Sequence, residues 1–133
     1  MIEKKSPIQT HLLMQSHKDC VINFIEHVWN QSIFYEIDQY LHRNFIDHSM
    51  PFQHFRNQNG LILYLQELSK TVRHHTVIVD LVVLNNYILV DTRIHVILLQ
   101  PGTEGEQPVD IINAVRLFRM EDGKIKEHWE FID

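Results

Sequence analysis

The chain has 133 residues, of which 44% are hydrophobic and 22% are charged, the composition of one ordinary globular domain and not of a disordered chain. Its 17 acidic and 12 basic residues give a formal net charge of −5, and the basic residues are scattered, which excludes the concentrated basic surface of a nucleic-acid-binding protein. No apolar run reaches the roughly 18 residues of a membrane span, and one cysteine, Cys20, excludes an internal disulfide. We therefore expect a single cytoplasmic domain, 1–133, without a nucleic-acid or membrane partner.

The first half of the chain predicts about three helices and one short extended segment. Apolar residues recur at helical spacing in residues 18–30, 35–41 and 60–72. Residues 45–48 read as a brief extended piece, and Pro51 soon interrupts regular structure. We expect residues 1–16 to be a tail or a first helical turn.

In the second half the hydrophobic period changes from 3.6 to 2, which predicts strands. Four strands are expected, at residues 76–84, 87–99, 109–120 and 125–132. Asn85-Asn86 suits a tight turn, and residues 100–108, with two glycines, suit a longer loop. Helices followed by a run of antiparallel strands indicate an α+β fold, with a curved sheet covered by helices on one face.

The strand at residues 87–99 is apolar on both of its faces. An antiparallel sheet usually leaves one face in water, so the second face needs a partner, and a homodimer is the simplest one. Asp91, Arg93 and His95 alternate along this strand and therefore share one face. They line a pocket or form a charged stripe at the dimer interface; the sequence does not choose the face.

The last two strands flank Glu121-Asp122-Gly123, a strong hairpin signal. We favour a three-residue turn with a bulge and a positive φ at Gly123, which places Arg116 opposite His128 and Ala114 opposite Glu130. A two-residue turn instead places Arg116 opposite Trp129. In the favoured register Arg116, His128 and Glu130 point together into a cavity, and the opposite face carries the following apolar residues: Val115, Leu117, Ile125, Trp129 and Phe131.

Several enzyme classes leave no trace in the sequence. It has no phosphate-binding loop, no dinucleotide-binding glycine motif and no nucleophile elbow. Its ten histidines show no paired ligand spacing. We therefore expect neither a metal nor a cofactor.

Two motifs carry a resemblance to a known family. The run FRMEDGKIKEHWEFID at residues 118–133 resembles the typical ending of the SnoaL-like branch of the nuclear transport factor 2 superfamily. The run FIDHSMP at residues 45–51 is a weaker match, at the place where the family has a hydrophobic pair, an acid and His-Asn-Pro. The resemblance covers residues 18–133. It implies a cone-shaped α+β barrel, in which helices and sheet enclose a deep pocket, and usually a homodimer.

The family includes polyketide cyclases, which close a ring by an intramolecular aldol reaction with an acid/base carboxylate and no cofactor. Relatives are isomerases, epoxide hydrolases, dehydratases and pocket proteins. The resemblance puts Glu130 at the position of the catalytic Asp and Arg116 at the position of its His or Asp helper. Arg cannot exchange protons near pH 7, so this departure argues against cyclase chemistry as such.

Two hypotheses follow. The first is a pocket protein that binds a small apolar or weakly acidic ligand, and the second is a cofactor-independent lyase, isomerase, cyclase or hydrolase with Glu130 as acid/base. The Arg116–Glu130 pair is equally compatible with a structural ion pair and with a role in the pocket. The candidate catalytic residues are Glu130, Arg116 and His128. The candidate ligand-binding residues are His48, Tyr40, Phe52, Tyr64, Arg93 and Asp91.

Overall fold

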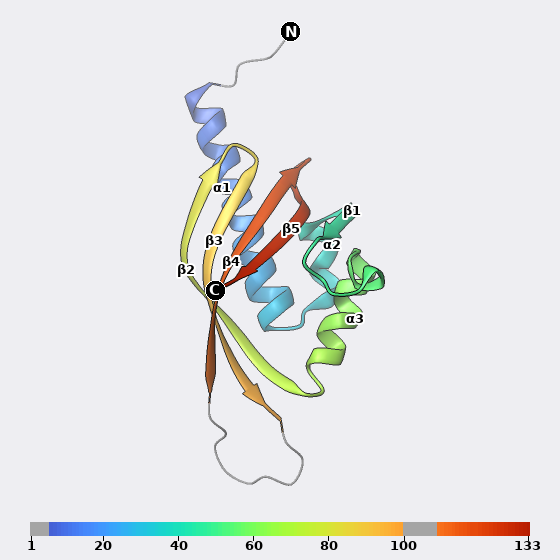
Figure 1. Cartoon of the computed structure of the whole chain (residues 1–133). Helices are drawn as coiled ribbons and strands as arrows, with labels where there is room; N and C mark the ends of the chain where they lie inside the picture. Colours follow the sequence, from blue (N-terminus) through green and yellow to red (C-terminus); the bar gives the residue numbers. More distant parts are fainter. Residues whose placement is uncertain (1–5, 100–108) are drawn as a thin grey trace.

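The computed structural model describes residues 6–99 and 109–133, and the expected loop at 100–108 lies outside them. One five-stranded sheet, in the order β1-β5-β4-β3-β2, curves beside three α-helices (Figure 1). Its strands are β1 (Leu41–Asp47), β2 (Val72–Leu84), β3 (Tyr87–Leu98), β4 (Asp110–Glu121) and β5 (Lys124–Ile132). Neighbouring strands from β2 to β5 are antiparallel, but β1 pairs with β5 in parallel. The α+β cone is confirmed, with a mixed and open sheet.

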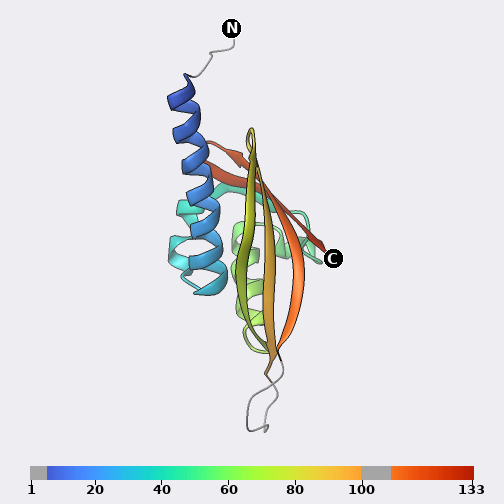
Figure 2. The same cartoon turned by 90° about the vertical axis from the view of Figure 1, so that its left-hand side faces the viewer.

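The helical segments come from the first half of the chain, as predicted. They are α1 (Pro7–Asn23), the π-helix η1 (Phe24–Asn30), the 3-10 turn η2 (Phe34–Glu36), α2 (Ile37–Tyr40), the 3-10 turn η3 (Gln53–Phe55) and α3 (Gln58–Leu68). None of the described helices is long and apolar enough to cross a membrane. Figure 2 shows α1 and η1 running along one side of the sheet.

Two helix boundaries differ from the predicted ones. Helix α1 begins at Pro7 because Ser6 and Gln9 form a reciprocal capping box, so residues 7–16 are not a tail. Helix α3 ends at Leu68, and β2 already begins at Val72, so the predicted helix at residues 60–72 was too long. The first turns of α1 are largely exposed and show no clear hydrophobic period, whereas Ser69, Lys70 and Thr71 after α3 form a short polar connection to β2.

The concave face of the sheet packs against α1 and η1 and forms the core. The fully buried core side chains include Val21, Phe24, Ile25, Val28, Ile88, Val90 and Phe118. Along β3 the even-numbered residues Ile88, Val90 and Thr92 point inward. Asp91 and Arg93 are therefore exposed on the opposite face, which corrects their assignment as ligand-binding residues.

The β4–β5 hairpin has a two-residue turn, so the predicted three-residue turn was wrong. Asp122 and Gly123 have φ of 54° and 75°, as a type I′ turn requires, and Glu121 pairs with Lys124. The positive φ of Gly123 is confirmed.

A bulge one pair further on then changes the register of this hairpin. Met120 pairs with Ile125, but Arg119 pairs with Glu127, which leaves Lys126 as an extra residue on β5. Arg116 consequently lies opposite Glu130, and Phe118 opposite His128. Since the bulge shifts the register by one residue, the inner face expected for Arg116, His128 and Glu130 is restored. Ile125, predicted on the outer face, points into the core.

Candidate functional site

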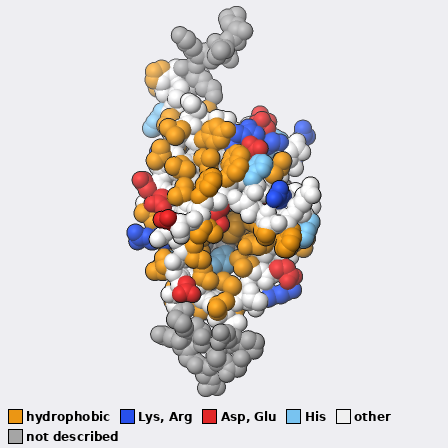
Figure 3. Space-filling view, in the orientation of Figure 1, with side chains coloured by type: hydrophobic (Ala, Val, Ile, Leu, Met, Phe, Trp, Pro, Cys, Tyr) orange, Lys and Arg blue, Asp and Glu red, His pale blue; other side chains and the backbone are white. Residues whose placement is uncertain are grey.

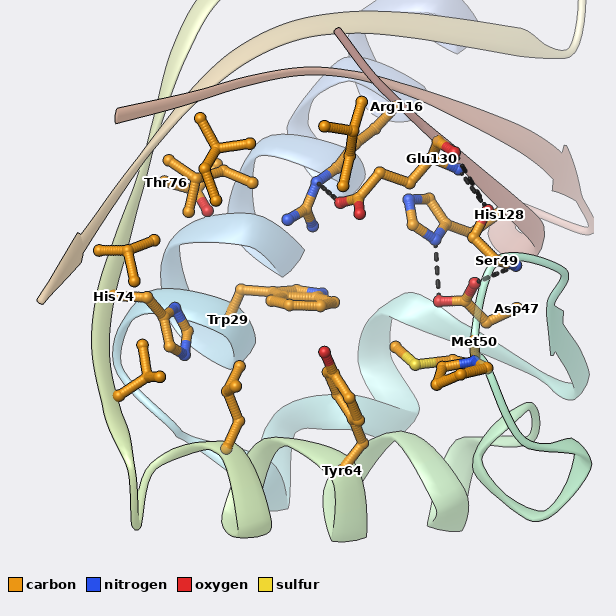
Figure 4. A pocket seen from close by; sticks show the side chains of 17 residues that line it. Trp29, Asp47, Ser49, Met50, Tyr64, His74, Thr76, Arg116, His128 and Glu130 are labelled. Carbon is orange, nitrogen blue, oxygen red and sulfur yellow. Dashed lines mark hydrogen bonds and ion pairs between the residues drawn. The ribbon is translucent and has the colours of Figure 1, made fainter. Parts of the chain in front are cut away.

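A cavity of about 240 Å³ lies between the concave face of the sheet, η1, α3 and the segment after β1 (Figure 4). Its wall is mostly apolar, with a few polar groups that converge on one side. The lining residues are Trp29, Asp47, Ser49, Met50, Pro51, Tyr64, Leu68, Val72, His74, Thr76, Ile94, Val96, Ile112, Arg116, His128, Glu130 and Ile132. The cavity is somewhat smaller than most small-molecule sites, but an apolar wall with a few convergent polar groups is typical of them.

Arg116 is the cation of this cavity, and only 1% of its surface is exposed. Its Nε lies 3.2 Å from Oε2 of Glu130, and its guanidinium carbon lies 4.2 Å from the centre of the Trp29 ring. Burial lowers the pKa of Arg116, and the charges of Glu130 and Asp47 oppose this effect. Its Nη1 is buried and has no hydrogen-bond partner within residues 6–99 and 109–133. A charged donor therefore faces the cavity unused.

The widened helix η1 places Trp29 beneath Arg116. The side chain of the next residue, Asn30, holds the backbone of Thr76 through two hydrogen bonds of 2.8 and 2.9 Å, which fasten η1 to β2. Trp29 is 8% exposed, and its indole face offers the guanidinium a cation–π contact. The indole ring of Trp29 thus fixes the orientation of the Arg116 guanidinium at the cavity wall.

Asp47 and His128 form a second buried pair, on the neighbouring strands β1 and β5. They are register partners, and Oδ2 of Asp47 lies 2.9 Å from Nδ1 of His128. Burial alone raises the pKa of Asp47, but the hydrogen bond with His128, the electrostatic influence of His128 and Arg116 and the backbone N–H of Ser49 outweigh it, so the pKa is lowered. The other ring nitrogen, Nε2 of His128, is buried without a hydrogen-bond partner in the described parts of the chain.

Tyr64 and His74 close the cavity opposite these two pairs. The phenol of Tyr64 points into the cavity from α3, and burial together with the charge of Glu130 raises its pKa (Figure 4). Burial and the nearby Arg116 lower the pKa of His74, which keeps this imidazole neutral near pH 7. Arg116 is therefore the permanent positive charge in a site that also holds two carboxyl groups.

The sequence model of the SnoaL-like polyketide cyclases matches residues 19–133, most of the chain. The chain belongs to this family. No curated protein is a significant match in sequence. The match confirms the resemblance predicted from the hairpin and from the FIDHSMP run, and it makes this chain a SnoaL-like protein with a pocket.

Solved structures of SnoaL-like proteins share this fold at low sequence identity. A candidate SnoaL-like polyketide cyclase from Jannaschia sp. superposes with a TM-score of 0.76 at 17% identity, over 99% of this chain and 92% of that chain. A candidate polyketide cyclase from Bacillus cereus gives 0.74 at 22% identity, over 97% and 79% of the two chains. An epoxide hydrolase of the LEH-like type from M. tuberculosis gives 0.71 at 15%, over 90% and 84%. Identities this low show the fold and not the reaction.

Four of the nine predicted site residues line the cavity of this SnoaL-like chain: Arg116, His128, Glu130 and Tyr64. The other five do not. Asp91 and Arg93 face outward. Tyr40 is packed in the core, where its hydroxyl lies 2.9 Å from Nδ1 of His27. Phe52 is 59% exposed on the loop before η3.

His48 also lies outside the cavity, although it directly follows Asp47. Its ring stacks on Trp129 with 4.8 Å between ring centres, and its Nε2 lies 3.1 Å from Oε1 of Glu127. Alternation along β1 explains this placement: Phe45 and Asp47 point inward, so His48 points outward.

Sequence reasoning missed Asp47, Trp29 and His74 as site residues. For Asp47 the signal was present, because it is the acid of the FIDHSMP run and shares the inward parity of Phe45. Trp29 and His74 gave no such signal. They meet at the cavity only because η1 packs against β2, with 6.2 Å between their ring centres.

Among the described residues, one other group has the spacing of metal ligands: His42 of β1 with Glu121 and Asp122 at the tip of the β4–β5 hairpin. Nε2 of His42 lies 3.6 Å from Glu121 and 3.5 Å from Asp122. Nδ1 of His42 accepts the backbone N–H of Asn44, so Nε2 carries the proton and faces the two acids. This arrangement suits a neutral imidazole whose Nε2–H faces the two carboxylates, and not a metal ligand.

Proposed function

We propose that this protein binds a small, largely apolar molecule whose carboxylate or carbonyl oxygen is held by Arg116. The cavity supports this proposal in its lining, since apolar side chains from η1, α3, the segment after β1 and strands β2 to β5 make up most of its wall. A molecule of a dozen or so heavy atoms suits this volume, at the small end of protein ligand sites. The contacts of Arg116 indicate the polar end of that molecule.

The observation that carries the proposal is the unpartnered Nη1 of Arg116, a buried guanidinium N–H directed at the cavity. A buried charge is costly unless it is paired and hydrogen-bonded. Glu130 meets Arg116 only at the Nε edge, and Trp29 covers one face of the group. A ligand oxygen at the unpartnered Nη1 supplies the missing hydrogen bond, and a carboxylate suits the planar guanidinium best.

Calorimetry with two matched probes tests this proposal. We expect 3-phenylpropanoate to bind at least about tenfold more tightly than 3-phenyl-1-propanol, because a hydrogen bond to a charged group contributes about 1.5–3 kcal/mol. Arg116→Met removes this preference and spares binding of the alcohol. Arg119→Met, which removes an arginine outside the cavity, preserves it. If neither probe binds, or if the preference survives Arg116→Met, the proposal is wrong.

Loss of Arg116 leaves Glu130 without its counter-charge, so a second variant guards against misfolding. The double change Arg116→Met with Glu130→Gln removes both charges and keeps the volumes similar. It is expected to fold, as judged by circular dichroism, and to bind the two probes equally. Retained preference for the carboxylate in this variant also contradicts the assignment.

The second candidate function is a cofactor-independent enzyme, a lyase, isomerase, cyclase or hydrolase, with Glu130 as acid/base. It is favoured by the polar cluster itself, since Glu130, Arg116 and His128 converge on one side of an apolar cavity. The named cyclases and the epoxide hydrolase of this fold are consistent with such chemistry. Turnover of a carbonyl substrate that Glu130→Gln abolishes, with binding unchanged, distinguishes this function from binding alone.

We also propose that the protein is a cytoplasmic homodimer that pairs through the outer face of its sheet. Val82, Leu89, Leu117 and Trp129 are successive register partners across four strands and form an apolar row on that face. Val82 and Leu89 are 45% and 38% exposed. Figure 3 shows hydrophobic side chains gathered over this part of β2, β3 and β4. An exposed patch of this kind favours a partner surface.

A further inference from the structure

Asp47 and His128 are held in a geometry that fixes which nitrogen of the imidazole carries a proton. The Asp47 side chain accepts two hydrogen bonds, from Nδ1 of His128 at 2.9 Å and from the backbone N–H of Ser49 at 3.0 Å. Both side chains are buried, with 1% and 3% of their surface exposed. The lowered pKa of Asp47 keeps it ionised, so it only accepts, and Nδ1 of His128 must donate.

In the neutral imidazole the remaining nitrogen, Nε2, then has a free lone pair. This atom is buried and finds no hydrogen-bond donor in the regions that the structure describes. Figure 4 shows it directed away from Asp47, toward the side of the cavity where Arg116 and Glu130 lie. A buried basic nitrogen without a hydrogen-bond partner lowers the stability of the fold. A pair that serves only to stabilise the fold does not need such a nitrogen.

The segment that carries Asp47 is fastened to the strand that carries His128. The backbone N–H of His48 donates to the carbonyl of His128, and the Ser49 hydroxyl accepts the N–H of Glu130 at 2.6 Å. These bonds extend the parallel β1–β5 pairing beyond Asp47. The pair is thus built into the sheet and does not depend on one flexible contact.

We propose that His128 is a general base that removes a proton from the carbon next to a carbonyl group, with Asp47 as its positioning residue. The inference rests on the proposed function, because Arg116 has to hold the carbonyl oxygen. The C–H electron pair forms a C=C bond, and the carbonyl π electrons move to the oxygen, which becomes an enolate on Nη1 of Arg116. His128 becomes an imidazolium next to ionised Asp47, and it returns its proton to carbon or oxygen. The net reaction is a keto–enol isomerisation or an exchange of that proton with solvent.

His128 suits this role better than Glu130 does. The Glu130 carboxylate is engaged by Arg116, and 22% of its side chain is exposed, whereas Nε2 of His128 is unengaged and shielded. Glu130 instead holds the guanidinium in place. This division assigns proton transfer to one pair and oxygen binding to the other.

Phenylpyruvate is a suitable probe, because it offers a carboxylate, a ketone and an exchangeable CH₂ group in a molecule of the right size. Deuterium exchange at its CH₂ in D₂O, followed by NMR, is expected to exceed the rate in buffer. His128→Gln should lower this acceleration about 10²-fold or more, the usual range for loss of a general base. The matched control, His75→Gln, changes an exposed histidine of β2 and should match the unchanged protein.

Asp47→Asn tests the positioning role. The Asn amide can donate to Nδ1 and thereby move the imidazole proton to Nε2, so kcat for exchange should fall about 10²-fold while KM stays similar. ¹⁵N NMR of His128 should show the tautomer change, which a merely structural role does not produce. Asp19→Asn, on the exposed side of α1, is the control.

The outcomes separate the two proposals. If 3-phenylpropanoate binds through Arg116 but phenylpyruvate exchange is not accelerated, or if His128→Gln leaves the rate unchanged, the general base is wrong and the binding function stands. Exchange that depends on Glu130 and not on His128 also overturns it. If neither compound binds, the proposed function itself fails.

Discussion

Arg116 and Glu130 lie directly opposite each other on β4 and β5, and their Nε and Oε2 atoms are 3.2 Å apart at the wall of the cavity. Arg116 is almost completely buried, whereas 22% of the Glu130 side chain is exposed. Arg116 therefore accounts for most of the desolvation cost of the pair. A substitution of Glu130 then mainly reports what happens when the buried Arg116 loses its counter-charge.

Glu130→Ala should lower the free energy of unfolding by about 3 kcal/mol. This value is the low end of the range for breaking a buried pair, since water reaches Glu130 but not Arg116. Urea denaturation measures the effect, and Glu130→Gln, which keeps the shape, separates lost charge from lost packing. Glu127→Ala is the matched control: its partner Arg119 is 22% exposed, so the loss should stay below about 1 kcal/mol. Equal losses for the two alanine variants would contradict the assignment of Arg116 as a buried charge.

The pairing of Arg116 with Glu130 shows how far the sequence could specify the site. Strand alternation predicts that both residues share a face with His128, and this prediction is confirmed. The exact partner was not predictable, because the type I′ turn and the bulge at Lys126 shift the register in succession. A bulge residue such as Lys126 has no distinctive chemistry in the sequence.

The fold was more predictable than the site. The change of period after the helices and the C-terminal motif indicated an α+β cone and its family, both of which are confirmed. The cavity, however, is assembled from segments far apart in sequence, such as η1 with Trp29 and β2 with His74. The hydrophobic periodicity of one segment carries no information about contacts between distant segments. It also does not show which face of the sheet Asp91 and Arg93 occupy.

Gly123→Val should destabilise the protein by about 1 kcal/mol or more through strain in the left-handed region. Gly123 has a φ of 75°, and a Cβ there meets no atom within 4 Å, so backbone strain and not a clash is the cause. The melting temperature measures the loss. Gly123→Asn is the control, since Asn tolerates this conformation and should cost less. A melting temperature unaffected by Val shows that the turn adopts another geometry in solution.

Leu117→Arg should convert the proposed homodimer into a monomer. Leu117 lies in the middle of the apolar row, between Leu89 and Trp129, so a charge there is desolvated on association. Light scattering at micromolar concentration distinguishes the two states. Leu12→Arg changes an apolar residue of α1 that is 62% exposed and should leave the dimer intact. A protein that is already monomeric before the change refutes the proposed interface.

Asp47 should give the protein an acid-dependent stability. Burial raises its pKa, but His128 and the other nearby groups lower the pKa by more than burial raises it. The folded-state pKa therefore lies below the ordinary Asp value of about 4. A carboxyl group with a lower pKa in the folded than in the unfolded chain stabilises the fold above that ordinary value. This stabilisation is lost as the pH falls through the folded-state pKa.

Asp47→Asn removes the titrating group, so its stability should depend less on pH than that of the unchanged protein between about pH 5 and 3. Urea midpoints measured across this interval provide the comparison. Asp19→Asn, which changes an exposed carboxylate, should retain the full acid dependence. A variant at Asp47 whose stability falls with acid as steeply as before would mean that the carboxylate is not held ionised by His128. The tautomer of His128, and with it the free lone pair on Nε2, would then lose its physical basis.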